Sequence, residues 1–278
     1  MTSINIDIKR ESEIDPMCGT KAMTLVELKK INLPIPDFYA VSSACFEKFC
    51  EDCNVQSIMS FYKNNEFNER ESKKFVDIDA CNDMAVLEEN ENTRYMVRSS
   101  AIPTNDVDLK IFASMISGAF ESYMASSVYE VMKMILEVWK SVYLEKAYNQ
   151  CRIFSKEPII SGIGVLIQKY VEPVISGVAH TEQNTISVNW LEGHLSKIVS
   201  GQVIGNSVKM YKSLEQDYIL RGIEKNILLI KENNYEMVFQ SVFDIVTIIK
   251  QYFSCEQEVE WVYDGKKVWI VQAQPLIV

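Results

Sequence analysis

Two carboxylates and two amides near the C-terminal end of the 278-residue chain could hold a metal ion. They lie at alternate positions in two β-rich runs on either side of Asp264-Gly265, a typical hairpin turn. Carboxylates side by side repel each other unless a cation lies among them, and ligand sets made only of oxygen suit Mg²⁺ or Mn²⁺. A solvated outer face of an edge hairpin is the alternative. The four residues are Glu258, Glu260, Gln272 and Gln274.

The length of the turn decides whether these side chains share one face of the sheet. A two-residue turn would put Glu260 and Gln272 on opposite faces and scatter the polar groups. A three-residue loop pairs Tyr263 with Lys267, collects all four polar side chains on one face and leaves Trp261 among apolar residues on the other. We therefore predict the three-residue loop.

The helices and strands that must position these residues do not alternate strictly along the chain, which favours an α+β architecture. Apolar spacing and caps predict helices over 21–31, 43–53, 127–152, 215–232 and 235–253, and strands near 38–41, 94–97, 162–171, 175–180, 185–190 and 207–211. Residues 98–106 are predicted to be a polar loop directly after a strand, because they are rich in turn formers. The polar stretch 64–92 is interpreted as a mobile connection with a short helix near 84–89.

The composition of the chain excludes several classes of protein. The net charge of −10 argues against a general nucleic-acid binder, because such proteins use Lys and Arg to neutralise phosphates. The N-terminus has no apolar signal sequence, and no window approaches about eighteen uninterrupted apolar residues, so we expect a cytoplasmic protein without a membrane segment. Seven cysteines at irregular spacing do not look like a disulfide framework, and we expect reduced thiols.

Five segments, met in order along almost the whole chain, together resemble one known family. They are GTKAMTL at 19–25 with LPIP at 33–36, VRSSA at 97–101, GAFESYM at 118–124, VLIQKYV at 165–171 with SGV at 176–178, and EVEW at 258–261 with IVQAQP at 270–275. These segments resemble motifs of the N-terminal, ATP-grasp-type nucleotide-binding domain of phosphoenolpyruvate synthase, pyruvate phosphate dikinase and rifampin phosphotransferase. The commoner GxxxxGKS/T and GxGxxG phosphate loops do not occur in the sequence.

The resemblance implies a phosphate site. Lys21 and Arg98 would contact the phosphates of ATP, and the guanidinium of Arg98 offers a rigid fork of donors to their oxygens. The backbone around Gly118 and the side chain of Ser122 would cover the phosphates, because a glycine lets backbone N–H groups approach closely. Lys21 and Arg98 would thus act in catalysis as well as in binding.

The resemblance also implies which residues of the ATP site lie near the adenine and which hold the metal. The chain would be a single domain over 1–278, with ATP held between a lobe at 1–160 on the phosphate-loop side and a lobe at 161–278 on the adenine and metal side. Glu260 and Gln272 would hold Mg²⁺, which agrees with the hairpin face deduced above. The other residues implied to contact the nucleotide are Gln168, Lys169 and Val171 on the adenine side, and Glu258, which replaces an acidic residue of the same charge.

Three departures from the family pattern limit what the resemblance implies. Gln274 stands at a catalytic position where the family has an arginine that would steady the transferring phosphoryl group, and losing such a cation costs a factor of about a thousand or more in rate. The segment GHLSK at 193–197 lacks the family's GLGE pattern. The sequence ends after the hairpin, so we expect the phosphohistidine and substrate domains to be missing. His180 and His194 lie outside any phosphohistidine motif and are expected to be structural or exposed.

These observations favour an ATP-dependent phosphotransferase that binds ATP with Mg²⁺ or Mn²⁺. Its acceptor would be either a histidine on a separate partner protein or a small molecule phosphorylated directly. A nucleotide-binding or regulatory subunit that has lost catalysis is the main alternative, suggested by Gln274. An ATP-grasp ligase that acts through an acyl phosphate is a weaker one.

Overall fold

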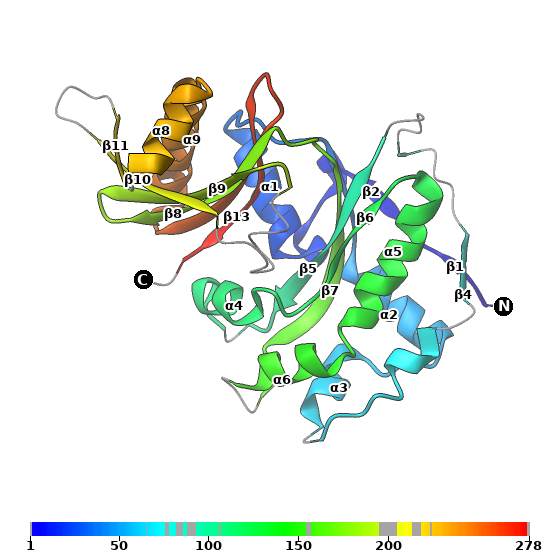
Figure 1. The fold of residues 1–278 in the computed structure, drawn as a ribbon. Coiled ribbons are helices and arrows are strands. Elements are labelled where there is room, and N and C mark those ends of the chain that lie inside the picture. The colour runs from blue at the N-terminus through cyan, green and yellow to red at the C-terminus, as the bar shows by residue number, and fades with distance from the viewer. Residues whose placement is uncertain are drawn as a thin grey trace. The chain divides into compact units, whose positions relative to one another are not determined.

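The computed structural model describes residues 2–64, 66–75, 78–81, 86–87, 93–105, 107–153, 157–194, 205–212, 218–222 and 224–276. The chain divides into two compact units, unit 1 with residues 1–26 and 37–170, and unit 2 with residues 27–36 and 171–278 (Figure 1). Each unit combines helices with a largely antiparallel sheet, so the predicted α+β fold class is confirmed. Within the described ranges no helix has both the length and the apolar character that a membrane span requires.

Unit 1 is built on a five-stranded antiparallel sheet in the order β2-β3-β7-β5-β6. Its strands are β2 (Ile8–Arg10), β3 (Phe38–Val41), β5 (Tyr95–Pro103), β6 (Ser122–Ala125) and β7 (Ile160–Lys169). A separate parallel pair joins β1 (Thr2–Asn5) to β4 (Ile78–Cys81). The helices are α1 (Thr20–Lys30), whose end belongs to unit 2, α2 (Ser43–Asp52), α3 (Ile58–Lys63), α4 (Leu109–Ile116), α5 (Val128–Ser141) and α6 (Glu145–Ile153), with short 3₁₀ turns at Glu11–Glu13, Pro16–Cys18 and Ser72–Phe75.

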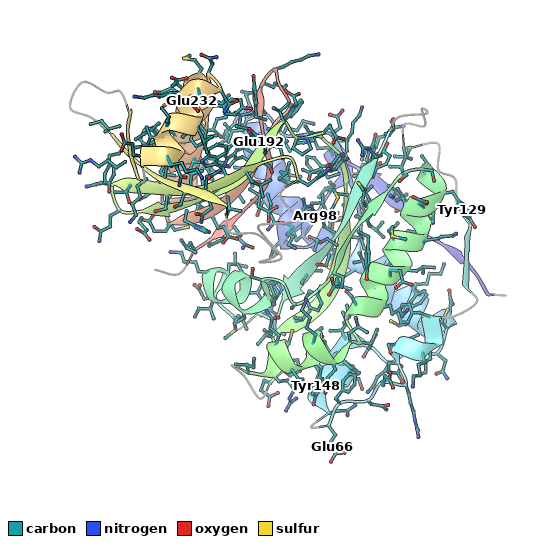
Figure 2. All side chains as sticks on the ribbon, viewed as in Figure 1. Glu66, Arg98, Tyr129, Tyr148, Glu192 and Glu232 are labelled. Carbon is teal, nitrogen blue, oxygen red and sulfur yellow. The ribbon has the colours of Figure 1, made fainter. Side chains whose placement is uncertain are left out.

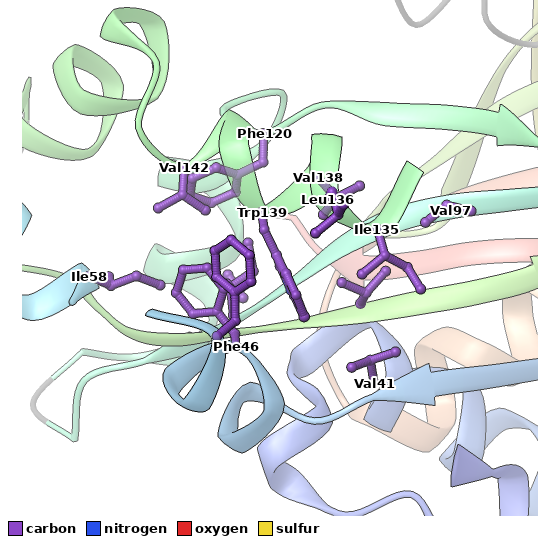
Figure 3. Packing of buried hydrophobic residues seen from close by; sticks show 14 of the residues in the cluster. Val41, Phe46, Ile58, Val97, Phe120, Ile135, Leu136, Val138, Trp139 and Val142 are labelled. Carbon is purple, nitrogen blue, oxygen red and sulfur yellow. The ribbon is translucent and has the colours of Figure 1, made fainter. Parts of the chain in front are cut away.

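The core of unit 1 lies between this sheet and helices α2, α3 and α5. Helix α5 begins where the Ser127 hydroxyl accepts a hydrogen bond from the amide of Glu130, and its apolar residues recur at helical spacing. Trp139 is fully buried and contacts two rings of α2, with centroid distances of 5.4 Å to Phe46 and 5.1 Å to Phe49 (Figure 3). This aromatic contact fixes α5 against α2.

Unit 2 is a six-stranded antiparallel sheet in the order β11-β10-β9-β8-β12-β13. Helix α9 packs on one face, where Phe239 contacts Trp190 and Trp261 with centroid distances of 5.5 and 5.9 Å. The opposite face carries mostly polar side chains, among them Ser187, His180 and Glu258. The strands are β8 (Ile175–Glu182), β9 (Thr185–Glu192), β10 (Asn206–Lys212), β11 (Tyr218–Gly222), β12 (Gln257–Tyr263) and β13 (Val268–Pro275), and the helices are α8 (Glu224–Glu232) and α9 (Glu236–Phe253).

The predicted polar loop at 98–106 is wrong, because β5 continues through Pro103. Ser99 and Ser100 are buried in the strand and pair with β7, and the hydroxyl of Ser100 accepts a hydrogen bond from the amide of Ala22 at 3.2 Å. The Ser100 hydroxyl is therefore satisfied by a distant partner, and the backbone stays extended.

The predicted helix over 127–152 is two helices. The amides of Val142, Tyr143 and Leu144 donate to carbonyls three residues back, so the chain turns there, and α6 starts anew at Glu145. The predicted helix over 215–232 begins only at Glu224, because 218–222 form β11. The helix predicted near 84–89 falls mostly outside the described residues.

The terminal hairpin forms, but its predicted register is wrong. Tyr263 pairs with Val268 instead of Lys267, and a β-bulge between Glu260 and Trp261 then shifts the register by one residue. The bulge pairs Glu260 with Gln272. Without the bulge, the pairing of Tyr263 with Val268 would put Glu260 and Gln272 on opposite faces of the sheet. The one-residue shift at the bulge brings them to the same face, so the four polar side chains still lie together.

Candidate functional site

The start of α1 is fixed to β5 in unit 1. Gly19 has φ 85° and ψ 171°, and a Cβ atom there would lie 1.9 Å from the carbonyl oxygen of Ser100, so only glycine allows this approach. The amide of Ala22 donates to the hydroxyl of Ser100 at 3.2 Å. Lys21 therefore lies in the first turn of a helix that is attached to the strand carrying Arg98.

Arg98 lies on β5, half-buried, directly opposite Ser122 of β6 (Figure 2). Directly opposed residues of an antiparallel pair project from the same face, with Cβ atoms about 5 Å apart. Gly118 lies in the turn just before β6 with φ 70°, and nothing lies within 4 Å of the position that its Cβ would take. The structure thus brings Arg98 and Ser122 together and leaves open space at Gly118.

The end of β7 carries a buried amide side chain. Gln168 is 2% exposed, and its Nε2 atom has no hydrogen-bond partner among the described residues. A buried donor left unsatisfied costs about 1–3 kcal/mol, so the Gln168 amide is a strong candidate to bind a ligand acceptor. Lys169 follows, with its backbone amide bonded to the carbonyl of Asp37 at 2.8 Å, and Val171 is the first residue of this segment in unit 2.

Glu260 and Gln272 place a carboxylate and an amide side by side on the polar face of unit 2. They lie directly opposite each other on β12 and β13 and are 7% and 8% exposed. Across the described part of the chain, no three His, Cys, Asp or Glu side chains gather as a complete metal site. Mg²⁺ is usually bound through one or two carboxylates together with substrate phosphates and water. The pair fits that ion as a partial site.

His180, Glu258 and Gln274 form a hydrogen-bonded cluster beside this pair. The His180 ring nitrogen Nε2 lies 2.8 Å from Glu258 Oε2, and Gln274 Nε2 donates to Glu258 Oε1 at 2.5 Å. The hydrogen bond with His180 holds the pKa of the Glu258 carboxyl below its usual range, against the opposing effect of burial. The structure therefore occupies the amide of Gln274 with Glu258.

A row of directly opposed polar residues crosses the whole sheet of unit 2. The row contains Arg221, Lys209, Ser187, His180, Glu258 and Gln274, one from each strand from β11 to β13. Sequence reasoning gave His180 no role. Its alternation within β8 could have shown that it shares a face with Ser176 and Val178, but the pairing with Glu258 joins residues 78 positions apart.

Comparisons with known proteins agree with the motifs. Residues 15–278 match the family described as pyruvate phosphate dikinase, AMP/ATP-binding domain. The chain is 23% identical to a probable phosphoenolpyruvate synthase of Archaeoglobus fulgidus, over 94% of this chain and 40% of that protein. It is 24% identical to a rifampicin phosphotransferase of Bacillus cereus, over 94% of this chain and 34% of that protein.

The chain thus spans at most about two fifths of the length of these two relatives. Among solved structures, the D-alanine–D-alanine ligase of Bacillus anthracis aligns with 94% of this chain and 57% of its own, at a TM-score of 0.39 and 9% identity. A similarity at that level does not establish a relationship, so the assignment depends on the sequence match over residues 15–278. That match confirms the resemblance described above, and the chain belongs to the pyruvate phosphate dikinase AMP/ATP-binding domain family.

Proposed function

We propose that the chain binds Mg-ATP and transfers a phosphoryl group from it to an acceptor. The observation that carries the proposal is the pairing of Glu260 with Gln272, which sets a buried carboxylate and a buried amide side by side in a chain of an ATP-binding family. Glu260 and Gln272 would hold Mg²⁺, whose charge would offset the negative charge that develops during phosphoryl transfer. Glu260 would provide the carboxylate ligand and Gln272 the amide oxygen.

We assign the phosphate contacts to residues of unit 1. Arg98 offers a planar fork of donors that suits phosphate oxygens, and Ser122 lies opposite it with an exposed hydroxyl. Lys21 supplies a second cation from the first turn of α1. The open space at Gly118 would allow backbone amides to approach the phosphates.

The adenine contacts are assigned to the end of β7 and the residues after it. The buried Nε2 atom of Gln168 can donate to a ring nitrogen of the base, which would relieve its unsatisfied state. Lys169 and Val171 continue from it and would border the base. Glu258 would act through the cluster that it forms with His180 and Gln274.

A second candidate is a nucleotide-binding subunit without catalysis. Gln274 stands where the related enzymes have an arginine, and its amide donates to Glu258. A neutral amide provides no charge to stabilise a transferring phosphoryl group, so transfer would be slow unless another cation compensates. This candidate keeps the ATP site and predicts binding without turnover.

Transfer of label from radioactive ATP distinguishes the two candidates. The protein is incubated with Mg²⁺, γ-labelled ATP and a cell extract that is separated by size into macromolecules and small molecules. Glu260→Gln removes the metal carboxylate, and Glu182→Gln, an exposed carboxylate of β8, is the matched control. Label in the small-molecule fraction indicates a small acceptor, and label on a protein other than this chain indicates a partner. Loss of either signal in Glu260→Gln alone supports the phosphotransferase, whereas no transfer supports the second candidate.

A further inference from the structure

His180 is held by a carboxylate of the neighbouring strand. Its Nε2 atom lies 2.8 Å from Glu258 Oε2, and the other oxygen of Glu258 accepts the amide of Gln274 at 2.5 Å. Both oxygens of the carboxylate are therefore fixed by side chains of neighbouring strands. Such a carboxylate sets the tautomer and orientation of a histidine, as in the nucleophile and base pairs of many enzymes.

The contact with Glu258 decides which ring nitrogen can react. A neutral imidazole that donates from Nε2 to Oε2 of Glu258, 2.8 Å away, carries its lone pair on Nδ1. Within the described part of the chain, Nδ1 of His180 makes no hydrogen bond. The side chain is 30% exposed, which leaves the ring accessible to a ligand.

His180 also lies close to the pair of oxygen ligands. It is opposite Glu258, while Glu260 lies two residues further along β12 on the same face. Two residues along a strand span about 7 Å, and opposed residues lie about 5 Å apart. A phosphate chain bound beside Glu260 and Gln272 would thus be within reach of the His180 ring.

We infer that His180 accepts a phosphoryl group from ATP on Nδ1, an inference that rests on the proposed function. The Nδ1 lone pair attacks the terminal phosphorus, the bond from that phosphorus to the bridging oxygen breaks, and its electron pair leaves with ADP. The proton on Nε2 stays hydrogen-bonded to Glu258, whose negative charge offsets the positive charge of the phosphorylated ring. His180 is thereby a covalent relay between ATP and the acceptor, and Glu258 and Gln274 are positioning residues.

The second histidine of the chain is a natural control. His194 lies just after β9, its side chain is 46% exposed, and its Nε2 is 3.8 Å from Glu172 Oε1, a carboxylate that is itself 60% exposed. A pair at that distance and exposure fixes the ring weakly. His180 and His194 thus share a glutamate neighbour but differ in the distance and the exposure of that contact.

Labelling of the purified full chain tests the inference. The wild type, His180→Gln and His194→Gln are incubated with Mg²⁺ and γ-labelled ATP, and the label on the protein is measured before and after acid and alkali. A phosphorus–nitrogen bond breaks in acid and survives alkali. Calorimetric titration with a non-hydrolysable ATP analogue, run on all three proteins, reports whether the nucleotide site is intact. Tandem mass spectrometry of wild-type peptides assigns the label to one histidine, even if a variant does not fold.

The expected result is acid-labile label on the wild type and on His194→Gln, mapped to His180 and lost in His180→Gln. Glu258→Gln should label more slowly than the wild type, because the charge that stabilises the phosphorylated ring is gone. Label that remains in His180→Gln or maps elsewhere overturns the inference. So does a wild type that binds the analogue without labelling, and that result leaves the proposed ATP site standing. A wild type that binds no analogue refutes the proposed function itself.

Discussion

Gly19 is the position where one added methyl group should cost unit 1 the most stability. Its φ of 85° and ψ of 171° lie in a region that is open almost only to glycine, and placing another residue there costs about 1–3 kcal/mol. The new Cβ would also lie 1.9 Å from the oxygen and 2.4 Å from the carbon of the Ser100 carbonyl. These are backbone atoms, so relief requires moving α1 away from β5 and losing the two side-chain hydrogen bonds between them, about 1 kcal/mol each.

Gly19→Ala is therefore expected to lower the free energy of unfolding by about 3–5 kcal/mol. For a chain of this size the Tm should fall by about 6–20 °C, measured by scanning calorimetry. Gly193→Ala is the matched control, because Gly193 has φ 84° and nothing within 4 Å of its added Cβ. Gly193→Ala should lower the free energy of unfolding only by the conformational cost, about 1–2 kcal/mol. Equal losses in the two variants would refute the steric argument.

Three further predictions concern unit 1. Asp15→Asn should lower the Tm near neutral pH but not well below pH 3.8, because the hydrogen bond from Lys9 lowers the pKa of Asp15 and its stabilisation disappears as the carboxylate is protonated. The exposure of the pair limits the effect to about 1 kcal/mol. An equal loss of Tm at both pH values would contradict this prediction. Burial raises the pKa values of Cys50 and Cys151 to about 12, so iodoacetamide at neutral pH should modify both only in denaturant, as peptide mass spectrometry would show. Ser100→Ala leaves a buried amide of α1 without its acceptor and should cost about 1–3 kcal/mol in urea unfolding, and an unchanged midpoint would refute that role.

The elements set by local patterns were predictable from the sequence. Helix α2 is capped by Ser42 and α5 by Ser127, and both bury the face that their apolar spacing indicates. The extension of β5 was not predictable, because Ser99 and Ser100 are held in the strand by partners far away in sequence. Local turn propensity was outweighed by strand pairing and burial.

The candidate site, too, was predictable from the sequence only in part. The polar face of the hairpin followed from alternation along β12 and β13, although the bulge that sets the register was missed. His180 could not be found from the sequence, because its partner Glu258 is on a strand reached only through the pairing of β8 with β12. A residue whose role depends on long-range register leaves no local signal.

Calorimetric titration with a non-hydrolysable ATP analogue tests the central claim that the chain has an ATP site containing Arg98. The wild type should bind with magnesium-dependent, micromolar affinity, and Arg98→Gln should bind much more weakly. Arg70→Gln, which removes an exposed arginine of the same unit, should bind like the wild type. No binding by the wild type, or equal binding by Arg98→Gln and Arg70→Gln, would contradict the assigned site.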